Sequence, residues 1–281
     1  MLSIMTLYGR NVFFRVEIII SLLFLVLTGV LAFTVLPLCP DTMEDAARRS
    51  PGIIQSLISR FTAPGPYVPF VSLAGAGLYS LVALVLIYFS FEKTQAPEIL
   101  FISLFVLSFS FETMRLITPL QKIRAIPSIY LLLASRALIF GRFFGIFALF
   151  AAGVYAAGLE VQKQINVILI TAFISLVVAF RIPIDILSWD SSFSMINGYR
   201  SLFRMIETVV LIITMSSFFI SAWSRGTPEY IAIGAGTFLV YAGRNILLSG
   251  DTWICPLPGL LLLTAGAWLI CTKLHKVYLW L

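Results

Sequence analysis

The sequence predicts an all-α fold, a polytopic transmembrane helical bundle of about eight membrane-spanning helices. Sixty per cent of the 281 residues are apolar and 11% are charged, far outside the usage of soluble globular proteins. Apolar segments long enough to cross a hydrocarbon core of ~30 Å recur along the whole chain. We therefore expect one integral membrane domain, 1–281, with spans at roughly 16–38, 67–91, 97–117, 129–158, 165–187, 203–223, 229–248 and 257–273.

The first segment is similar to a signal sequence, since Arg10 and Arg15 precede an apolar run. That run, 16–36, is too long for a cleaved signal and long enough to span, so we expect it to be retained. Cys39 follows it, but the residue before this cysteine is a leucine, where lipoprotein cleavage needs a small residue. We therefore do not expect lipidation.

A polar loop, 39–66, separates the first two spans. Pro51 suits the first turn of a helix. Two interpretations stay open: a short amphipathic helix on the membrane surface, or a linker packed on the bundle. The apolar residues at helical spacing in this loop are Ile53, Ile54, Leu57 and Ile58.

The later segments are joined by short connections. The connections 92–96 and 224–228 leave room only for tight turns between antiparallel neighbours. The fourth segment is long for a simple span, which is explained if it begins as an interfacial turn near Ser128. Within it, Gly141 and Gly145 form a GxxxG pair that predicts close helix packing. Aromatic residues mark the segment ends as an interfacial belt: Tyr88, Tyr155, Trp223 and Tyr230 at one face, and Tyr67, Tyr130, Trp189 and Trp253 at the other.

The basic residues are unevenly divided between the two faces. If the segments alternate, one face takes 12 Lys and Arg and the other takes 7, or 3 when the chain ends are left out. The positive-inside rule then places the first face in the cytoplasm and both termini outside. The loops around Lys93, Lys163 and Arg225 are expected to be extracytoplasmic, although Arg10 and Arg15 argue for the opposite orientation.

Five ionisable residues fall at nearly the same depth on five different segments. Each lies 15 or 16 residues from the same end of its span, ~22 Å into the membrane at 1.5 Å per residue. A charge at that depth is costly and normally faces the bundle interior, where it finds a partner. The five are Glu112, Arg142, Arg181, Glu207 and Arg244.

Three local pairs add opposite charges at helix-neighbour spacing. These are Glu112 with Arg115, Arg181 with Asp185, and Arg204 with Glu207. We expect Glu112 and Glu207 to contact at least one of Arg142, Arg181 and Arg244, because a short carboxylate cannot snorkel to the interface. The arginines could instead snorkel, or the charges could form a purely structural network. The candidate ligand-binding set is Glu112, Arg115, Arg142, Arg181, Asp185, Arg204, Glu207 and Arg244.

Catalytic and cofactor chemistry find little support in the residues. His275 is the single histidine and lies in the terminal segment, which excludes a histidine-based nucleophilic site or bis-histidine haem within the bundle. The three cysteines lack metal spacing, and we expect no metal and no cofactor. Basic residues are dispersed rather than clustered, so nucleic acid is not an expected partner.

An arginine-rich layer near one face suits a phosphate or a carboxylate, which arginine binds with two parallel hydrogen bonds. The leading hypothesis is a non-catalytic sensory or complex-forming subunit of a bacterial-type inner or cell membrane. Its expected partners are membrane lipid, in particular an anionic lipid headgroup, a small anion, or other membrane proteins. The alternative is a transporter of an anionic solute, and the third hypothesis is a lipid-modifying membrane enzyme.

Overall fold

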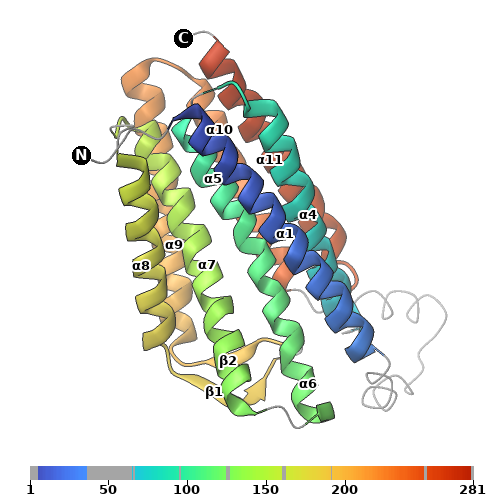
Figure 1. The fold of residues 1–281 in the computed structure, drawn as a ribbon. Helices are drawn as coiled ribbons and strands as arrows, with labels where there is room; N and C mark the ends of the chain where they lie inside the picture. Colours follow the sequence, from blue (N-terminus) through green and yellow to red (C-terminus); the bar gives the residue numbers. More distant parts are fainter. Residues whose placement is uncertain are drawn as a thin grey trace, which may run out of the picture.

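The computed structural model describes residues 6–36, 65, 67–94, 96–124, 127–159, 163–190, 192–249 and 252–279. In this part of the chain eight helices are long and apolar enough to cross a membrane, which confirms the all-α polytopic bundle (Figure 1). The helices that form them are α1 (Leu7–Val35), α4 (Val68–Phe91), α5 (Pro97–Ser108) continued by η3 (Phe109–Leu116) and α6 (Ile117–Arg124), α7 (Ser128–Ala156), α8 (Gln164–Arg181), α9 (Arg200–Arg225), α10 (Glu229–Ser249) and α11 (Pro256–Leu279).

The first helix begins at Leu7, nine residues before the predicted span 16–38. The Thr6 side chain caps it by accepting a hydrogen bond from the Gly9 amide at 3.2 Å. Arg10 donates to carbonyls at the end of α4, including that of Phe91 at 2.7 Å. Because the arginine finds these acceptors, the helix can start before its apolar run. The possible helix in 39–66 lies outside the described residues, apart from Gly65.

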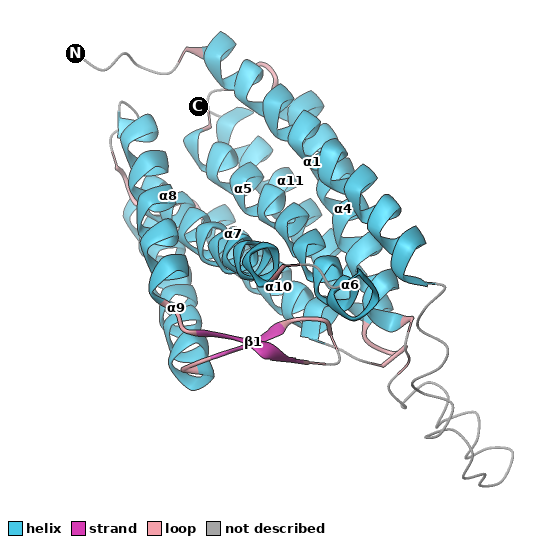
Figure 2. Ribbon diagram, turned by 60° about the horizontal axis from the view of Figure 1, so that its bottom comes forward, coloured by secondary structure: helices cyan, strands magenta, loops and turns pink. Residues whose placement is uncertain are grey.

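The third span, α5 with η3, is the centre of the bundle. It is the most buried of the eight spans and contacts α1, α4 and α7 (Figure 2). Its second half, Phe109–Leu116, is a 3₁₀ helix, which the sequence did not predict. With three residues per turn, residues three apart lie directly above one another. Ser110 and Thr113 therefore form one row, and Glu112 and Arg115 form part of another.

Two glycines let α7 approach this central span closely. A Cβ atom added to Gly141 would lie 2.5 Å from Cβ of Phe111, and one added to Gly145 would overlap the Ser108 side chain. This confirms the close packing expected of the GxxxG pair. Arg142 lies between these two glycines in the sequence. The close packing of α7 at Gly141 and Gly145 therefore places Arg142 next to η3.

A β-hairpin replaces the end of the predicted span 165–187. Helix α8 ends at Arg181, and Ile182 is extended, as expected for a residue before proline. Strands β1 (Ile184–Trp189) and β2 (Met195–Asn197) then pair antiparallel, with Ile184 opposite Asn197. The prediction of helix to 187 is wrong because Pro183 ends the helix. The hairpin lies at the end of the bundle beside α9 (Figure 2).

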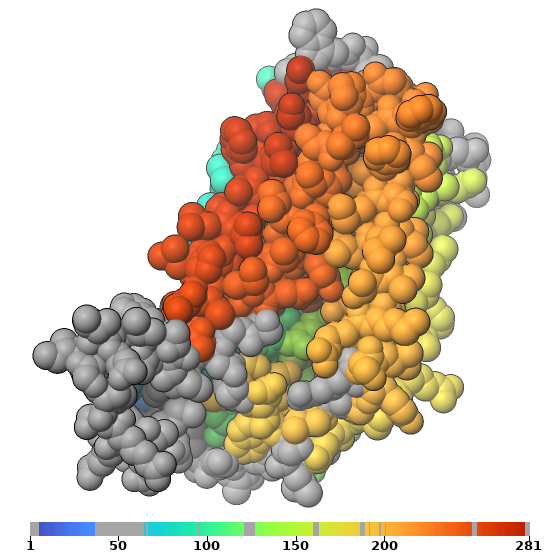
Figure 3. All heavy atoms as spheres, turned by 180° about the vertical axis from the view of Figure 1, so that it is seen from behind, coloured from blue at the N-terminus to red at the C-terminus, as the bar shows by residue number. Residues whose placement is uncertain are grey.

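Helices α10 and α11 pack backbone against backbone. A Cβ atom on Gly243 would lie 2.8 Å from the Gly259 carbonyl oxygen, and one on Gly266 would lie 2.8 Å from that of Gly236. Such small-residue contacts hold helices at a fixed rotation. Figure 3 shows α9, α10 and α11 side by side on the rear face. The rotation of α10 decides where Arg244 points.

Candidate anion-binding site

A buried carboxylate, Glu112 on η3, lies at the centre of the predicted charged layer. Its side chain is 2% exposed and forms an ion pair with Arg115, whose Nε lies 2.6 Å from Oε2. Arg142 binds both carboxylate oxygens, through Nε at 2.9 Å and Nη2 at 3.2 Å. Arg244 Nη2 lies 3.7 Å away. The contact predicted for Glu112 is therefore confirmed.

The arginines are held by more than the carboxylate. Arg115 also donates to the Leu248 carbonyl of α10 at 2.8 Å. The Arg244 guanidinium lies 5.9 Å from the centre of the Phe109 ring, one 3₁₀ turn before Glu112. These contacts fix the orientation of both groups before any ligand arrives.

The buried cluster carries more positive than negative charge. Arg115, Arg142 and Arg244 surround one carboxylate, so the four side chains have a net charge of 3 − 1 = +2. Arg115 and Arg244 are each 5% exposed, while Arg142 is 25% exposed. A buried charge without compensation is costly, and an anion at this place would reduce that cost.

A cavity of about 640 Å³ opens beside the cluster. Arg115 and Arg142 belong both to the cluster and to the cavity wall, so the two features form one site. The wall comes from η3, α7, α9, α10 and the hairpin region. Its other polar side chains are Asp190, Ser192, Ser194, Arg204, Glu207, Thr208, Tyr241 and Asn245.

Two further members of the predicted set line this cavity. Arg204 is exposed at its wall, and Glu207 is half-buried there. Glu207 accepts a hydrogen bond from the Tyr241 hydroxyl at 3.3 Å. Among the described residues it makes no ion pair with Arg142, Arg181 or Arg244, so that part of the prediction is wrong. Its carboxylate lines the same cavity as Arg142 but lies beyond ion-pair distance from it.

Arg181 and Asp185 do not join the site. Both are exposed, and neither lines the cavity. Arg181 ends α8, the helix on the far side of α7, and Asp185 pairs with Ile196 in the hairpin. Both side chains point away from the cavity although Ile182 lines it, because position along a helix does not specify the face on which a side chain lies.

Tyr241 and Asn245 line the cavity and are not among the residues predicted from the sequence. On α10, Asn245 follows Tyr241 by four residues and Leu248 follows Asn245 by three, so the three residues share one face of the helix. That pattern of polar residues beside Arg244 was the available signal. Such a signal is weak, since uncharged polar residues near a helix end are common in membrane proteins.

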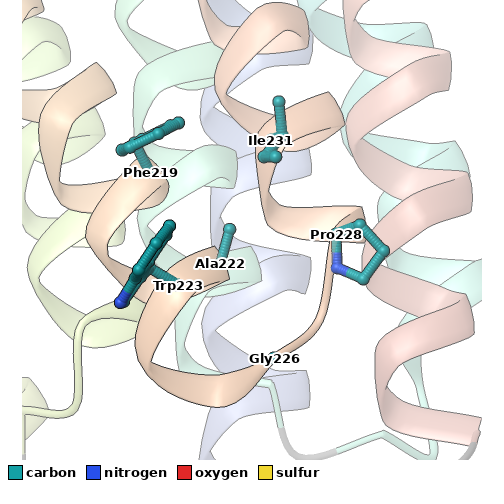
Figure 4. A pocket seen from close by; sticks show the side chains of 6 residues that line it. All are labelled: Phe219, Ala222, Trp223, Gly226, Pro228 and Ile231. Atoms are coloured by element: carbon teal, nitrogen blue, oxygen red, sulfur yellow. The ribbon is translucent and has the colours of Figure 1, made fainter.

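A second hollow has a different character. About 300 Å³ in volume, it lies at the turn between α9 and α10 and is lined by apolar side chains and Gly226 (Figure 4). Trp223 there is 85% exposed, as expected for an interfacial belt residue. This hollow offers no charged group to an ion. In the described part of the chain, no three His, Cys, Asp or Glu side chains come together as a metal site.

Comparison with known proteins reveals a distant relative. The chain is 21% identical, over 275 residues, to a Treponema pallidum (strain Nichols) protein described as uncharacterized, and the match covers 80% of both chains. No family model matches the chain. No solved structure matches it. The similarity extends over most of the membrane domain, and the relative's description carries no activity.

Proposed function

We propose that this protein is a non-catalytic integral membrane protein that binds a phosphate-bearing anion in the arginine-lined cavity. The observation that carries the proposal is the imbalance at Glu112, where three arginines share one buried carboxylate. Arginine binds phosphate oxygens with a planar fork of donors. A doubly charged phosphate would neutralise the +2 of the cluster.

Arg142 is the group best placed to reach the ligand. Its Nε and Nη2 donate to Glu112, which leaves the Nη1 donors for another acceptor. It is also the most exposed of the three clustered arginines. Arg204, at the cavity wall, would attract the anion before it reaches the buried groups.

The ligand is defined by its phosphate group, which an anionic lipid headgroup or free phosphate could supply. The charge bias of the loops supports a cytoplasmic position for the site in a bacterial-type inner or cell membrane. There, occupancy would report lipid composition or anion concentration to a partner membrane protein. That is the role of a sensory or complex-forming subunit.

Unfolding of the purified protein tests the proposal. Phosphatidylglycerol or inorganic phosphate should raise the stability of the wild type, and zwitterionic phosphatidylcholine should not. An effect of the lipid alone identifies a headgroup site, and an effect of phosphate identifies a free anion. Arg142→Gln should weaken binding about 30-fold or more, the equivalent of ~2 kcal/mol for a desolvated charge contact.

Arg136→Gln is the matched control on the same helix. Arg136 stacks over Phe180, with its guanidinium 4.6 Å from the ring centre, and does not line the cavity. This variant should keep the full anion effect. Equal anion responses in Arg142→Gln, Arg136→Gln and the wild type, or none in any of them, would refute the proposal.

Transport of an anionic solute is a second candidate, and one observation favours it. Buried polar side chains continue beyond the cavity along η3 and α1, toward the opposite end of the bundle. Uptake of labelled phosphate into liposomes that contain the protein would support transport. Binding without uptake would leave the sensory role.

A further inference from the structure

The face that α1 buries is unusually polar. Its buried side chains include Arg10, Glu17, Ser21 and Thr28, while the apolar Phe14 and Val35 complete the set. A membrane helix normally turns apolar groups to the lipid and keeps polar groups only where they serve a contact or a function. The partners of these four groups therefore show what the face is for.

Three of the four have clear partners. Arg10 donates to backbone carbonyls at the end of α4. The Ser21 hydroxyl lies 3.2 Å from that of Ser80 on α4, and the Thr28 hydroxyl lies 2.7 Å from that of Thr113 on η3. These contacts tie α1 to the centre of the bundle.

Glu17 is the exception. The residue is 1% exposed, and neither carboxylate oxygen has a hydrogen-bond partner among the described residues. Ser103 on α5 lies close to it. The Ser103 hydroxyl, however, donates to the Leu100 carbonyl at 2.8 Å rather than to the carboxylate.

The charged groups that the structure describes on the elements around α1 are already engaged. On α5, Glu98 accepts from the Tyr278 hydroxyl at 2.7 Å. On η3, Glu112 and Arg115 bind each other. The two arginines of α1 are engaged as well, since Arg15 donates to the Tyr88 hydroxyl at 2.9 Å and Arg10 donates to the Phe91 carbonyl. The other tyrosine of α4, Tyr79, donates to the Leu263 carbonyl at 3.3 Å. Helix α6 carries Lys122 and Arg124, whose side chains lie outside the described residues.

An ionised carboxylate without a cation is strongly disfavoured in an apolar interior. Glu17 lies ten residues into α1, ~15 Å along the helix axis from Leu7, within a helix long and apolar enough to span a membrane. A buried carboxyl group without a cation beside it is expected to hold a proton. Such residues mark proton or ion pathways in membrane proteins.

Hydroxyl groups continue from Glu17 toward the arginine cluster. Ser21, one helical turn from Glu17, forms a triangle with Ser80 and Ser110, in which each pair of hydroxyl oxygens is 3.1 to 3.2 Å apart. Ser110 and Thr113 lie in one row of η3, and Thr113 is the residue after Glu112.

We propose that Glu17 is a proton-binding site within the membrane, connected by the Ser21–Ser80–Ser110 triangle and the Thr28–Thr113 pair to the cavity end of the bundle. In each step a hydroxyl oxygen accepts one proton and releases its own to the next acceptor. Neither Glu17 oxygen is hydrogen-bonded to the triangle, and Ser21 and Thr28 are ~10 Å apart along α1, so water must bridge both gaps. This proposal does not depend on anion binding.

Infrared spectroscopy of the reconstituted full chain tests it. The wild type at neutral pH should show the C=O stretch of a protonated carboxyl group that Glu17→Gln removes. In D₂O that band should shift, because the proton exchanges. If the band is unchanged in Glu17→Gln, the group is ionised and the proposal is overturned.

Two serine variants test the pathway. Ser80→Ala breaks the triangle and should slow proton exchange at Glu17, seen as the band shift in D₂O, about tenfold or more. The effect should be smaller than the ~10²-fold that a positioned proton-transfer group often supplies, because water can partly replace the missing hydroxyl. Ser175→Ala is the control, since this buried serine on α8 donates only to the Thr171 carbonyl, at 2.7 Å. Equal exchange in both variants would overturn the hydroxyl pathway.

A hydrophobic carbodiimide supplies a second readout, because it adds to a protonated carboxyl group from the lipid phase. Mass spectrometry should find the adduct on Glu17 and not on Glu112, which is ionised by its arginines. Protection of Glu17 by sodium at constant pH would overturn the proposal in favour of a cation site.

Discussion

Replacing Glu112 with glutamine removes the single acidic group in contact with three arginines. The change keeps the shape of the side chain and deletes its charge. Arg115 and Arg244, each 5% exposed, would remain buried without a counter-charge, and Arg142 would lose both of its bonds to a carboxylate. We expect Glu112→Gln to insert in the membrane and to be markedly less stable than the wild type.

The magnitude follows from burial. Removing one partner of a buried pair typically costs ~3–5 kcal/mol, because the other charge is left uncompensated. An anion in the cavity can replace the lost carboxylate. At a concentration of 100 Kd it would contribute ~2.7 kcal/mol, which restores more than half of the loss. Anion stabilisation should therefore be larger in Glu112→Gln than in the wild type.

The assay is denaturant-induced unfolding in mixed micelles, with and without inorganic phosphate or phosphatidylglycerol. Glu229→Gln is the matched control, since Glu229 pairs with Lys276 at 3.1 Å, but that lysine is 54% exposed. An exposed pair contributes ~0–1 kcal/mol. If Glu112→Gln and Glu229→Gln lost the same stability, the cluster would not be a desolvated charge network and the reasoning would fail.

Three other predictions follow from the packing and the charge bias. Gly145→Ala should cost ~1–3 kcal/mol by overpacking against α5, whereas Gly29→Ala on open α1 surface should be neutral or stabilising in the same unfolding assay. Glu17→Gln should leave the free energy of unfolding unchanged or raise it, because a neutral carboxyl group has no ion pair to lose. A decrease in stability as large as that of Glu112→Gln would show that Glu17 has a charged partner. Single cysteines at Lys93 and Arg225 should react with a membrane-impermeant reagent in intact cells, and reaction only after lysis would reverse the orientation.

The spans and the depth of the charges could be predicted from sequence because both follow from local composition. Hydropathy places most helix ends to within a few residues, although α1 starts nine residues before its predicted span and α8 ends six residues before its predicted end. The rise of 1.5 Å per residue then assigns a depth to Glu112, Arg142 and Arg244. The short turns at 92–96 and 224–228 follow from the same count. Signals of this kind need no knowledge of which helices are neighbours.

The composition of the site depended on tertiary structure. Depth alone treats Arg181 and Arg142 alike, yet Arg142 lies on the helix that glycines bring against η3, while Arg181 ends a peripheral helix. The 3₁₀ turns that align Glu112 with Arg115 arise within the packed centre of the bundle.

The polar face of α1 is the clearest case. Glu17 lies inside a run whose hydropathy predicts only a span, and period alone does not say whether its side chain meets lipid or protein. In a bilayer both sides of a helix can be apolar, so the hydrophobic pattern that orients helices in water is weak here. The rotation of each helix is decided by close packing and polar contacts with neighbours distant in the sequence.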